Sequence, residues 1–189
     1  LDLLDVIGFA QTTFGDKLSN AQVADEVLDF MLGRFRAWYE SEGYGVDVIQ
    51  AVLARKPTNP SDFDRRVKAV AQFRKLDAAA ALAAANKRVA NILAKVEGDI
   101  ATTVNSALLQ EEAEQALHSA IVAEQTYQAA TQSYADGLAH LAQMREVIDN
   151  FFDKVMVNAD DAAVRANRQA LLKQLRELFL QVADISVLQ

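Results

Sequence analysis

The sequence predicts an all-α protein, a helical bundle of about six to seven helices, and three observations lead to this prediction. Gly and Pro are scarce, at seven and two in 189 residues, whereas turn-rich β architectures need many more such breakers. Residues with high helix propensity, above all Ala and Leu, are plentiful. Apolar residues also recur at spacings of three and four, as they do on the buried face of an amphipathic helix.

The first residues are expected to stand apart from the rest of the chain. Residues 1–14 predict a short apolar helix, and we interpret residues 1–19 as the end of a preceding helical region. Residues 20–189 are expected to form the helical domain itself. Because the chain starts at Leu1 rather than at Met, we expect it to be a fragment of a longer protein.

A long helix is predicted to begin near Asn20 and to end at the Gly43-Tyr44-Gly45 turn. Its start is indicated by Ser19 followed three residues later by Gln22, which is the pattern of a capping box. Its apolar stripe is expected to face the core and consists of Val23, Val27, Phe30, Met31, Phe35 and Trp38.

Two shorter helices are predicted next. The first runs from about Asp47 to Arg55. Asn59-Pro60 then marks a new helix start, because Pro is favoured in the first turn, and this helix is expected to continue to about Lys75. Its inward residues are expected to be Phe63, Val67 and Val70.

A fourth helix is expected after Asp77, which is placed to cap it. It opens with seven alanines among the eight residues 78–85, which favour helix and permit close approach of a neighbour. Residues 97–109, with Gly98 and a Thr/Asn/Ser cluster, predict a loop. The remaining helices are predicted at about 110–130, 133–154 and 160–184.

The tract FFDKVMVNADDAAVRANRQALLKQLRELFLQVADI, which begins at Phe151, contains one charge on an apolar stripe. The stripe consists of Val164, Leu171, Leu175, Leu178, Val182 and Ile185, and Arg168 lies on it. A buried guanidinium needs a carboxylate partner, because an unpaired buried charge is costly. Asp153 is the nearest acid in sequence without another role, so we predict a structural ion pair between Asp153 and Arg168. The alternative places Arg168 on RNA.

The net charge of −7 is unevenly distributed. Residues 55–95 hold ten Lys or Arg against three Asp or Glu, whereas residues 96–163 hold two against twelve. An acidic protein with one basic zone can bind phosphate locally, and the surrounding acid limits non-specific binding. The alternative is a solvated helical surface with uneven charge.

The basic zone supplies candidates for RNA binding. Helical spacing places their side chains in polar stripes, and we expect the cations of the third and fourth helices to form one groove. Single-stranded RNA loops are bound by cations that hold phosphates together with groups that stack on or hydrogen-bond to bases. Tyr39 and Tyr44 are considered as exposed stacking rings. Arg34 and Arg36 lie before the basic zone and are added because they are close to these rings. The full set of candidates is Arg34, Arg36, Arg65, Arg66, Lys68, Lys87, Arg88, Asn91 and Lys95. Ordinary helix surface is the alternative for each.

The sequence contains little that indicates a catalytic site or a metal-binding site. The chain has no Cys, which excludes thiolate chemistry and disulfides. Gly43-x-Gly45 lacks the further Gly of a phosphate-binding loop, and no Ser/His/Asp grouping stands out. Glu114-x-x-x-His118 and Asp136-x-x-x-His140 place an acid and a His one turn apart, but the acids that a helical metal site needs on further helices are not identifiable. We expect no catalytic residue, no metal site and no membrane span.

Three tracts resemble a known family. They are the tract from Phe151, the tract LDFMLGRFRAWYESEGYGVDVIQAVLARKP from Leu28, and the tract LDAAAALAAANKRVANILAK from Leu76. Together they resemble the C-terminal end of the beta subunit of the bacterial two-subunit glycyl-tRNA synthetase, over most of residues 20–189. The resemblance implies an all-helical, DALR-type anticodon-binding domain related to that of class I arginyl-tRNA synthetase.

The resemblance also implies a role. The domain would bind the anticodon loop of tRNA(Gly), whose second and third anticodon letters are both C, in the cytoplasm. The alpha subunit of the heterotetramer would carry the active site, so ATP, magnesium and glycine would serve the whole enzyme, and this chain would hold no cofactor and have no activity of its own. DNA and membranes are not expected as partners. The alternative is a helical scaffold or protein-docking module, in which residues 1–14 would matter most.

Overall fold

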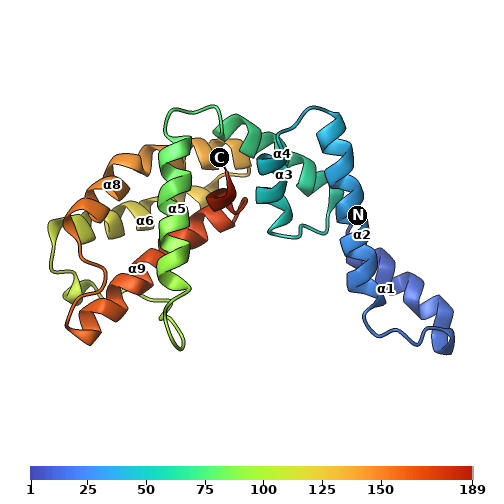
Figure 1. Cartoon of the computed structure of the whole chain (residues 1–189), viewed down its shortest axis with the longest axis horizontal. Coiled ribbons are helices and arrows are strands. Elements are labelled where there is room, and N and C mark those ends of the chain that lie inside the picture. Colours follow the sequence, from blue (N-terminus) through green and yellow to red (C-terminus); the bar gives the residue numbers. More distant parts are fainter. Residues whose placement is uncertain (189) are drawn as a thin grey trace.

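The structure, a computed structural model, describes residues 1–188, and every regular element in that range is helical, which confirms the all-α prediction. Figure 1 shows an elongated molecule with a projecting helical hairpin at one end and a larger bundle at the other. The α-helices are α1 (Leu3–Phe14), α2 (Val23–Ser41), α3 (Val46–Leu53), α4 (Pro60–Phe73), α5 (Ala79–Leu93), α6 (Glu112–Ala130), α7 (Tyr134–Leu141), α8 (Arg145–Lys154) and α9 (Ala162–Leu180). Short 3-10 turns are η1 (Gly15–Lys17), η2 (Ser106–Leu108), η3 (Ala142–Met144) and η4 (Ile185–Val187).

Local signals explain several helix starts. The Asn59 side chain accepts hydrogen bonds from the N–H groups of Ser61 and Asp62, at 3.0 and 3.2 Å, so α4 begins where the sequence predicts. Asp161 caps α9 in the same way. The expected capping box of Ser19 and Gln22 is wrong, because α2 begins at Val23 without a side-chain cap. The single helix expected over 133–154 is divided by η3 into α7 and α8.

The projecting hairpin consists of α1 and α2 (Figure 1). No side chain of α1 is buried. On α2 the buried residues are Leu28, Leu32 and Tyr39, and the Tyr39 hydroxyl donates to Asp64 Oδ1 on α4 at 2.9 Å. Trp38 and Phe30, expected in the core, are 57% and 63% exposed, and Tyr39, considered for exposure, is buried. The cause is rotational, because adjacent residues on a helix point about 100° apart.

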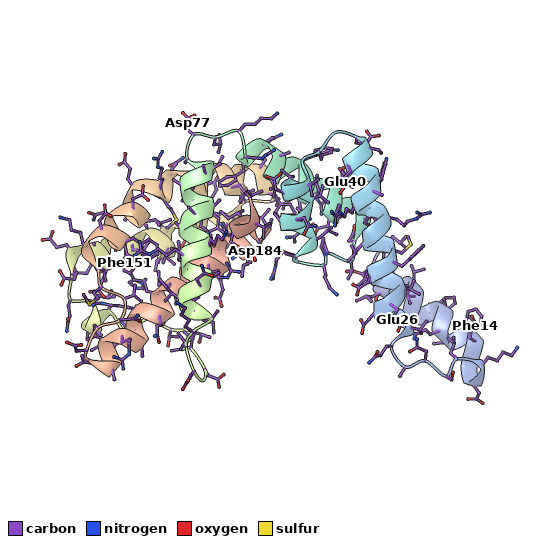
Figure 2. The ribbon with its side chains drawn as sticks, in the orientation of Figure 1. Phe14, Glu26, Glu40, Asp77, Phe151 and Asp184 are labelled. Carbon is purple, nitrogen blue, oxygen red and sulfur yellow. The ribbon has the colours of Figure 1, made fainter. Side chains whose placement is uncertain are left out.

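The bundle gathers its core around large apolar side chains. Phe63 and Phe73 of α4, Phe151 of α8 and Phe179 of α9 are almost completely buried. Helix α5 packs against α9, α8 and η4, while α6 packs against α8, α9 and α7. Figure 2 shows Phe151 and Asp184 within this half of the molecule, whereas Phe14 and Glu26 lie on the hairpin.

The long connection between α5 and α6 is fastened to α9. Asn167 Oδ1 accepts from the backbone N–H of Asn105 at 2.7 Å, and Asn167 Nδ2 donates to the carbonyl of the same residue at 3.0 Å. Lys173 and Gln174 donate to the carbonyls of Ile100 and Thr102. The predicted loop over 97–109 therefore contains only η2 as regular structure but is held in place along its length.

The charge on the apolar stripe of α9 is paired, but with a different acid from the one expected. Arg168 is buried and forms an ion pair with Glu114 of α6. Asp153 is exposed at the end of α8, so the predicted pair between Asp153 and Arg168 is wrong. The Asp153 side chain lies on the outer face of its helix, whereas Glu114 lies on the side of α6 that packs against α9.

Candidate RNA-binding site

A groove of about 510 Å³ lies between α5 and α9, with polar and apolar side chains in its lining. Lys87 and Asn91 of α5 line it on the face opposite the buried Leu82 and Val89, and Lys95, in the turn that follows α5, continues their spacing of four residues. Across from α5 the groove is lined by Asn158 and Gln169, and Arg88 lines it as well. A second hollow shares Lys95, Asn158 and Gln169 and adds Arg165 and Glu97. We call the two together the α5–α9 groove.

The α5–α9 groove carries a net positive charge, because Lys87, Arg88, Lys95 and Arg165 line it together with a single acid, Glu97. Within residues 1–188, no carboxylate lies at salt-bridge distance from Lys87, Arg88 or Lys95. Arg165 donates through Nη1 to the carbonyl of Ala159 at 2.6 Å, so its guanidinium is positioned without losing its charge. Unpaired cations in a concave site raise the local concentration of anions such as phosphates.

The cations of α4 lie in a different environment. Arg65 and Arg66 both bind Asp62, and Lys68 binds Asp64 at 2.7 Å, all within α4. The expectation that the cations of α4 and α5 form one groove is therefore wrong. The α5 residues line the α5–α9 groove, while the α4 residues are paired with acids of their own helix.

Arg66 has a structural role. Its guanidinium lies over the ring of Tyr134 at 4.5 Å and donates to the carbonyls of Gln181 and Val182, at 2.6 and 2.7 Å, just after α9. The Tyr134 hydroxyl in turn donates to Asp62 at 2.8 Å. Burial alone would raise the pKa of Asp62, but the hydrogen bonds from Arg66, Tyr134 and Arg65 outweigh it and hold that pKa below its ordinary value.

The remaining candidates, Arg34 and Arg36, lie on the hairpin, far from α5 (Figure 1). Arg34 lies over the Phe30 ring at 5.7 Å, and Arg36 pairs with Glu40 at 2.8 Å. The nine candidates are thus divided among three places, and only Lys87, Arg88, Asn91 and Lys95 line one groove.

The acid and His pairs noted in the sequence do not assemble into a metal site. His140 binds Glu124 of α6 rather than Asp136 and is stacked on Tyr127, with ring centroids 3.9 Å apart. Among residues 1–188 there is no group of three or more His, Cys, Asp or Glu placed to hold a metal ion. In the same range no helix is both long and apolar enough to span a membrane.

The segment of the chain that contains the groove matches a known protein family. The model of the DALR anticodon binding domain matches residues 82–186, which run from the first turn of α5 to η4. The chain belongs to the DALR anticodon binding domain family. Every residue that lines the α5–α9 groove falls inside the DALR match, whereas Arg34, Arg36, Arg65, Arg66 and Lys68 precede it.

The chain is also similar along its whole length to longer proteins. It is 62% identical over 192 residues to the glycine–tRNA ligase beta subunit of Actinobacillus pleuropneumoniae serotype 3 (strain JL03). It is 60% identical over 192 residues to the protein of the same name from Aliivibrio fischeri (strain MJ11). In both cases all of the chain is matched, and it spans 28% of the relative's length.

The sequence did not reveal the residues that α9 and the turn before it contribute to the α5–α9 groove. Arg165 and Gln169 are spaced by four on α9, so both lie on one face of that helix, and this signal was available. Asn158 precedes an acidic turn and carries no periodic signal. Its place opposite α5 follows only from how α9 packs on α5.

Proposed function

We propose that this chain is the anticodon-binding part of a glycine–tRNA ligase beta subunit and that the α5–α9 groove receives the anticodon loop of tRNA(Gly). Two findings support the proposal. The family match covers the whole groove, and the similar proteins are named glycine–tRNA ligase beta subunit. The observation that carries it is the groove itself, where three unpaired cations and three amides converge between two helices.

The chemistry of the groove suits a single-stranded RNA loop. Lys87, Lys95 and Arg165 supply positive charge for phosphates along its length. The side-chain amides of Asn91, Asn158 and Gln169 each offer donors and an acceptor to the edge of a splayed base. A cytosine presents an N4 amine donor beside its acceptors, so an amide can pair with it. The two cytosines shared by glycine anticodons are therefore the bases assigned to this groove.

In this proposal the chain works as a binding module within a larger enzyme. Activation of glycine with ATP and magnesium, and transfer to tRNA, belong to the alpha subunit of an alpha and beta heterotetramer in the cytoplasm. The anticodon site would contribute binding energy that orients the acceptor end of the tRNA toward that distant active site. No cofactor is assigned to this chain.

The deciding experiment compares tRNA(Gly) with the same tRNA in which both anticodon cytosines are replaced. We expect tighter binding of the natural tRNA and a steep fall in affinity with salt, because each neutralised phosphate releases counterions. Lys87→Gln and Lys95→Gln should weaken binding and flatten the salt dependence. Lys17→Gln, an exposed change on the hairpin, is the matched control and should do neither. Equal binding of both tRNAs would contradict anticodon recognition.

A second candidate function, docking to protein, is favoured by one observation on the hairpin. Its large apolar side chains are turned to solvent, and Phe9, Phe14 and Trp38 are 74%, 55% and 57% exposed. Large apolar side chains left exposed to solvent are candidates for contact with another protein. We propose as the occupant the part of the beta subunit that this chain does not cover, since the chain spans 28% of the relatives' length.

The docking proposal is tested by binding of the chain to the separately produced remainder of a relative's beta subunit. Phe30→Ser combined with Trp38→Ser should abolish the complex and leave RNA affinity unchanged. Binding that survives these changes would exclude this face. Insensitivity of the complex to salt separates it from RNA binding.

A further inference from the structure

One arginine of the α5–α9 groove lies over an aromatic ring. The guanidinium carbon of Arg88, on α5, lies 4.3 Å from the centroid of the Phe152 ring, on α8. Arg88 is exposed, and among residues 1–188 it makes no hydrogen bond or ion pair. Its donors are therefore uncommitted, and the face of the guanidinium turned away from Phe152 is open. This differs from Arg66, each of whose three guanidinium nitrogens donates to a group of the chain.

The ring beneath Arg88 is anchored to the core. Phe152 is half-buried and meets the ring of Phe151 edge to face, with centroids 5.5 Å apart and planes at 78°. Phe151 is completely buried. The contact with this anchored ring therefore restricts the guanidinium before any ligand arrives, which lowers the entropy lost when a ligand stacks on it.

A fixed, exposed guanidinium plane is a surface on which nucleobases stack, because it is flat, cationic and weakly hydrated. The amides of Asn91, Asn158 and Gln169 line the same groove and can reach the edge of a base held there. Lys87 and Lys95 flank the position with charge for the neighbouring phosphates.

We propose that the Arg88–Phe152 stack is the platform for one unstacked base of the bound RNA loop. The inference rests on the proposed function and deepens it, because it separates base recognition at Arg88 from charge attraction at Lys87 and Lys95. Arg88 contributes through the plane of its guanidinium, and Phe152 is a positioning residue that acts through Arg88.

The test uses the 189-residue chain and an RNA hairpin with the anticodon loop of tRNA(Gly). A series of hairpins carries an abasic residue at each loop position in turn. Arg88→Lys keeps the charge and the contact with Phe152 but removes the plane, and Lys87→Gln removes charge as the comparison. Melting temperatures show that each variant is folded.

We expect Arg88→Lys to lose on the order of tenfold in affinity for the intact hairpin, because stacking of one base is lost, while its salt dependence stays that of the wild type. For one abasic hairpin the wild type and Arg88→Lys should bind equally. Phe152→Leu should show the same pattern with a smaller loss. Lys87→Gln should weaken binding to all hairpins by a similar factor and flatten the salt dependence.

Two results would overturn the platform and leave the proposed function intact. The first is wild-type affinity of Arg88→Lys for the intact hairpin. The second is an equal loss on every abasic hairpin, which would make Arg88 a phosphate contact. Failure of the wild-type chain to bind any hairpin would instead reject the proposed function, and the platform with it.

Discussion

Arg168 of α9 and Glu114 of α6 are 54 residues apart in sequence and are joined by two hydrogen bonds inside the bundle. Nε donates to Oε1 at 2.8 Å and Nη2 donates to Oε2 at 3.0 Å, while Nη1 donates to the carbonyl of Met156 at 2.8 Å. Both side chains are buried. The guanidinium therefore ties together α6, α9 and the turn that leads into α9.

Removal of this arginine should be strongly destabilising. Arg168→Ala leaves Glu114 charged and without its partner in the core, and breaking a buried pair in this way costs about 3–5 kcal/mol. Asp153→Ala, which changes an exposed acid, should stay within about 0.5 kcal/mol of the wild type. Urea unfolding followed by circular dichroism measures both. Equal stability of the two variants would contradict the pairing.

The same pair predicts loss of stability in acid. Burial would raise the pKa of Glu114, but hydrogen bonds from Arg168 and from the N–H groups of Glu111 and Gln110 lower it below the ordinary 4.5. A carboxyl whose pKa is lower in the folded state stabilises the fold fully above its unfolded pKa, and this contribution disappears as pH falls through the folded pKa. The melting temperature should therefore fall below about pH 4.5. Glu114→Gln should flatten that dependence, whereas Glu112→Gln, at an exposed neighbour, should retain it.

Substitution of the two adjacent arginines of α4, Arg65 and Arg66, should lower stability by different amounts. Arg66→Ala removes the hydrogen bonds to the carbonyls of Gln181 and Val182 and the contact with Tyr134, so we expect a cost of about 2 kcal/mol. Arg65→Ala removes only an exposed pair with Asp62 and should cost less than about 1 kcal/mol. Chemical unfolding of the two variants side by side checks this difference. If Arg65→Ala proved the more damaging, the structural role of Arg66 would be wrong.

Substitution of Gly45 and of Gly33 by Ala should change the stability of the protein in opposite directions. A Cβ at Gly45 would lie 2.7 Å from Asp47 Oδ1 and 2.9 Å from Arg74 Nη1, so Gly45→Ala must loosen the ion pair between these residues. At Gly33, in the middle of α2, a Cβ would meet nothing within 4 Å. Gly33→Ala should therefore stabilise the protein by roughly 0.5–1 kcal/mol through helix propensity. Gly45→Ala should lower the melting temperature, and thermal scans of both variants give the signs directly.

Features with a local cause were predicted well from the sequence. Asn59-Pro60 starts α4 because a side-chain cap and a fixed φ act on neighbouring residues. The alignment of Lys87 and Asn91 on α5 with Lys95 just after it was predicted, because all three are spaced by four residues. The buried position of Arg168 likewise followed from the periodicity of its own helix.

Features that depend on packing between distant segments were not predicted. Glu114 lies in the first turn of α6, where an acid is expected for local reasons, and it does accept hydrogen bonds from the N–H groups of Gln110 and Glu111. Nothing in the sequence distinguishes it from other acids at helix starts as the partner of Arg168. Helix α2 carries two apolar faces, and only contact with Phe63 of α4 decides that Tyr39 rather than Trp38 is buried. The α9 side of the groove and the ring beneath Arg88 likewise arise from tertiary contacts.

Because the connection between α5 and α6 is attached to α9, hydrogen exchange of its backbone can report on the state of the α5–α9 groove. The amide of Asn105 is held by Asn167, and α9 also forms one wall of the groove. Because the same connection leaves α5 at its other end, a ligand that separates α9 from α5 strains this bond. Deuterium uptake at Asn105 would then reveal occupancy of the groove from a position that the ligand itself never touches.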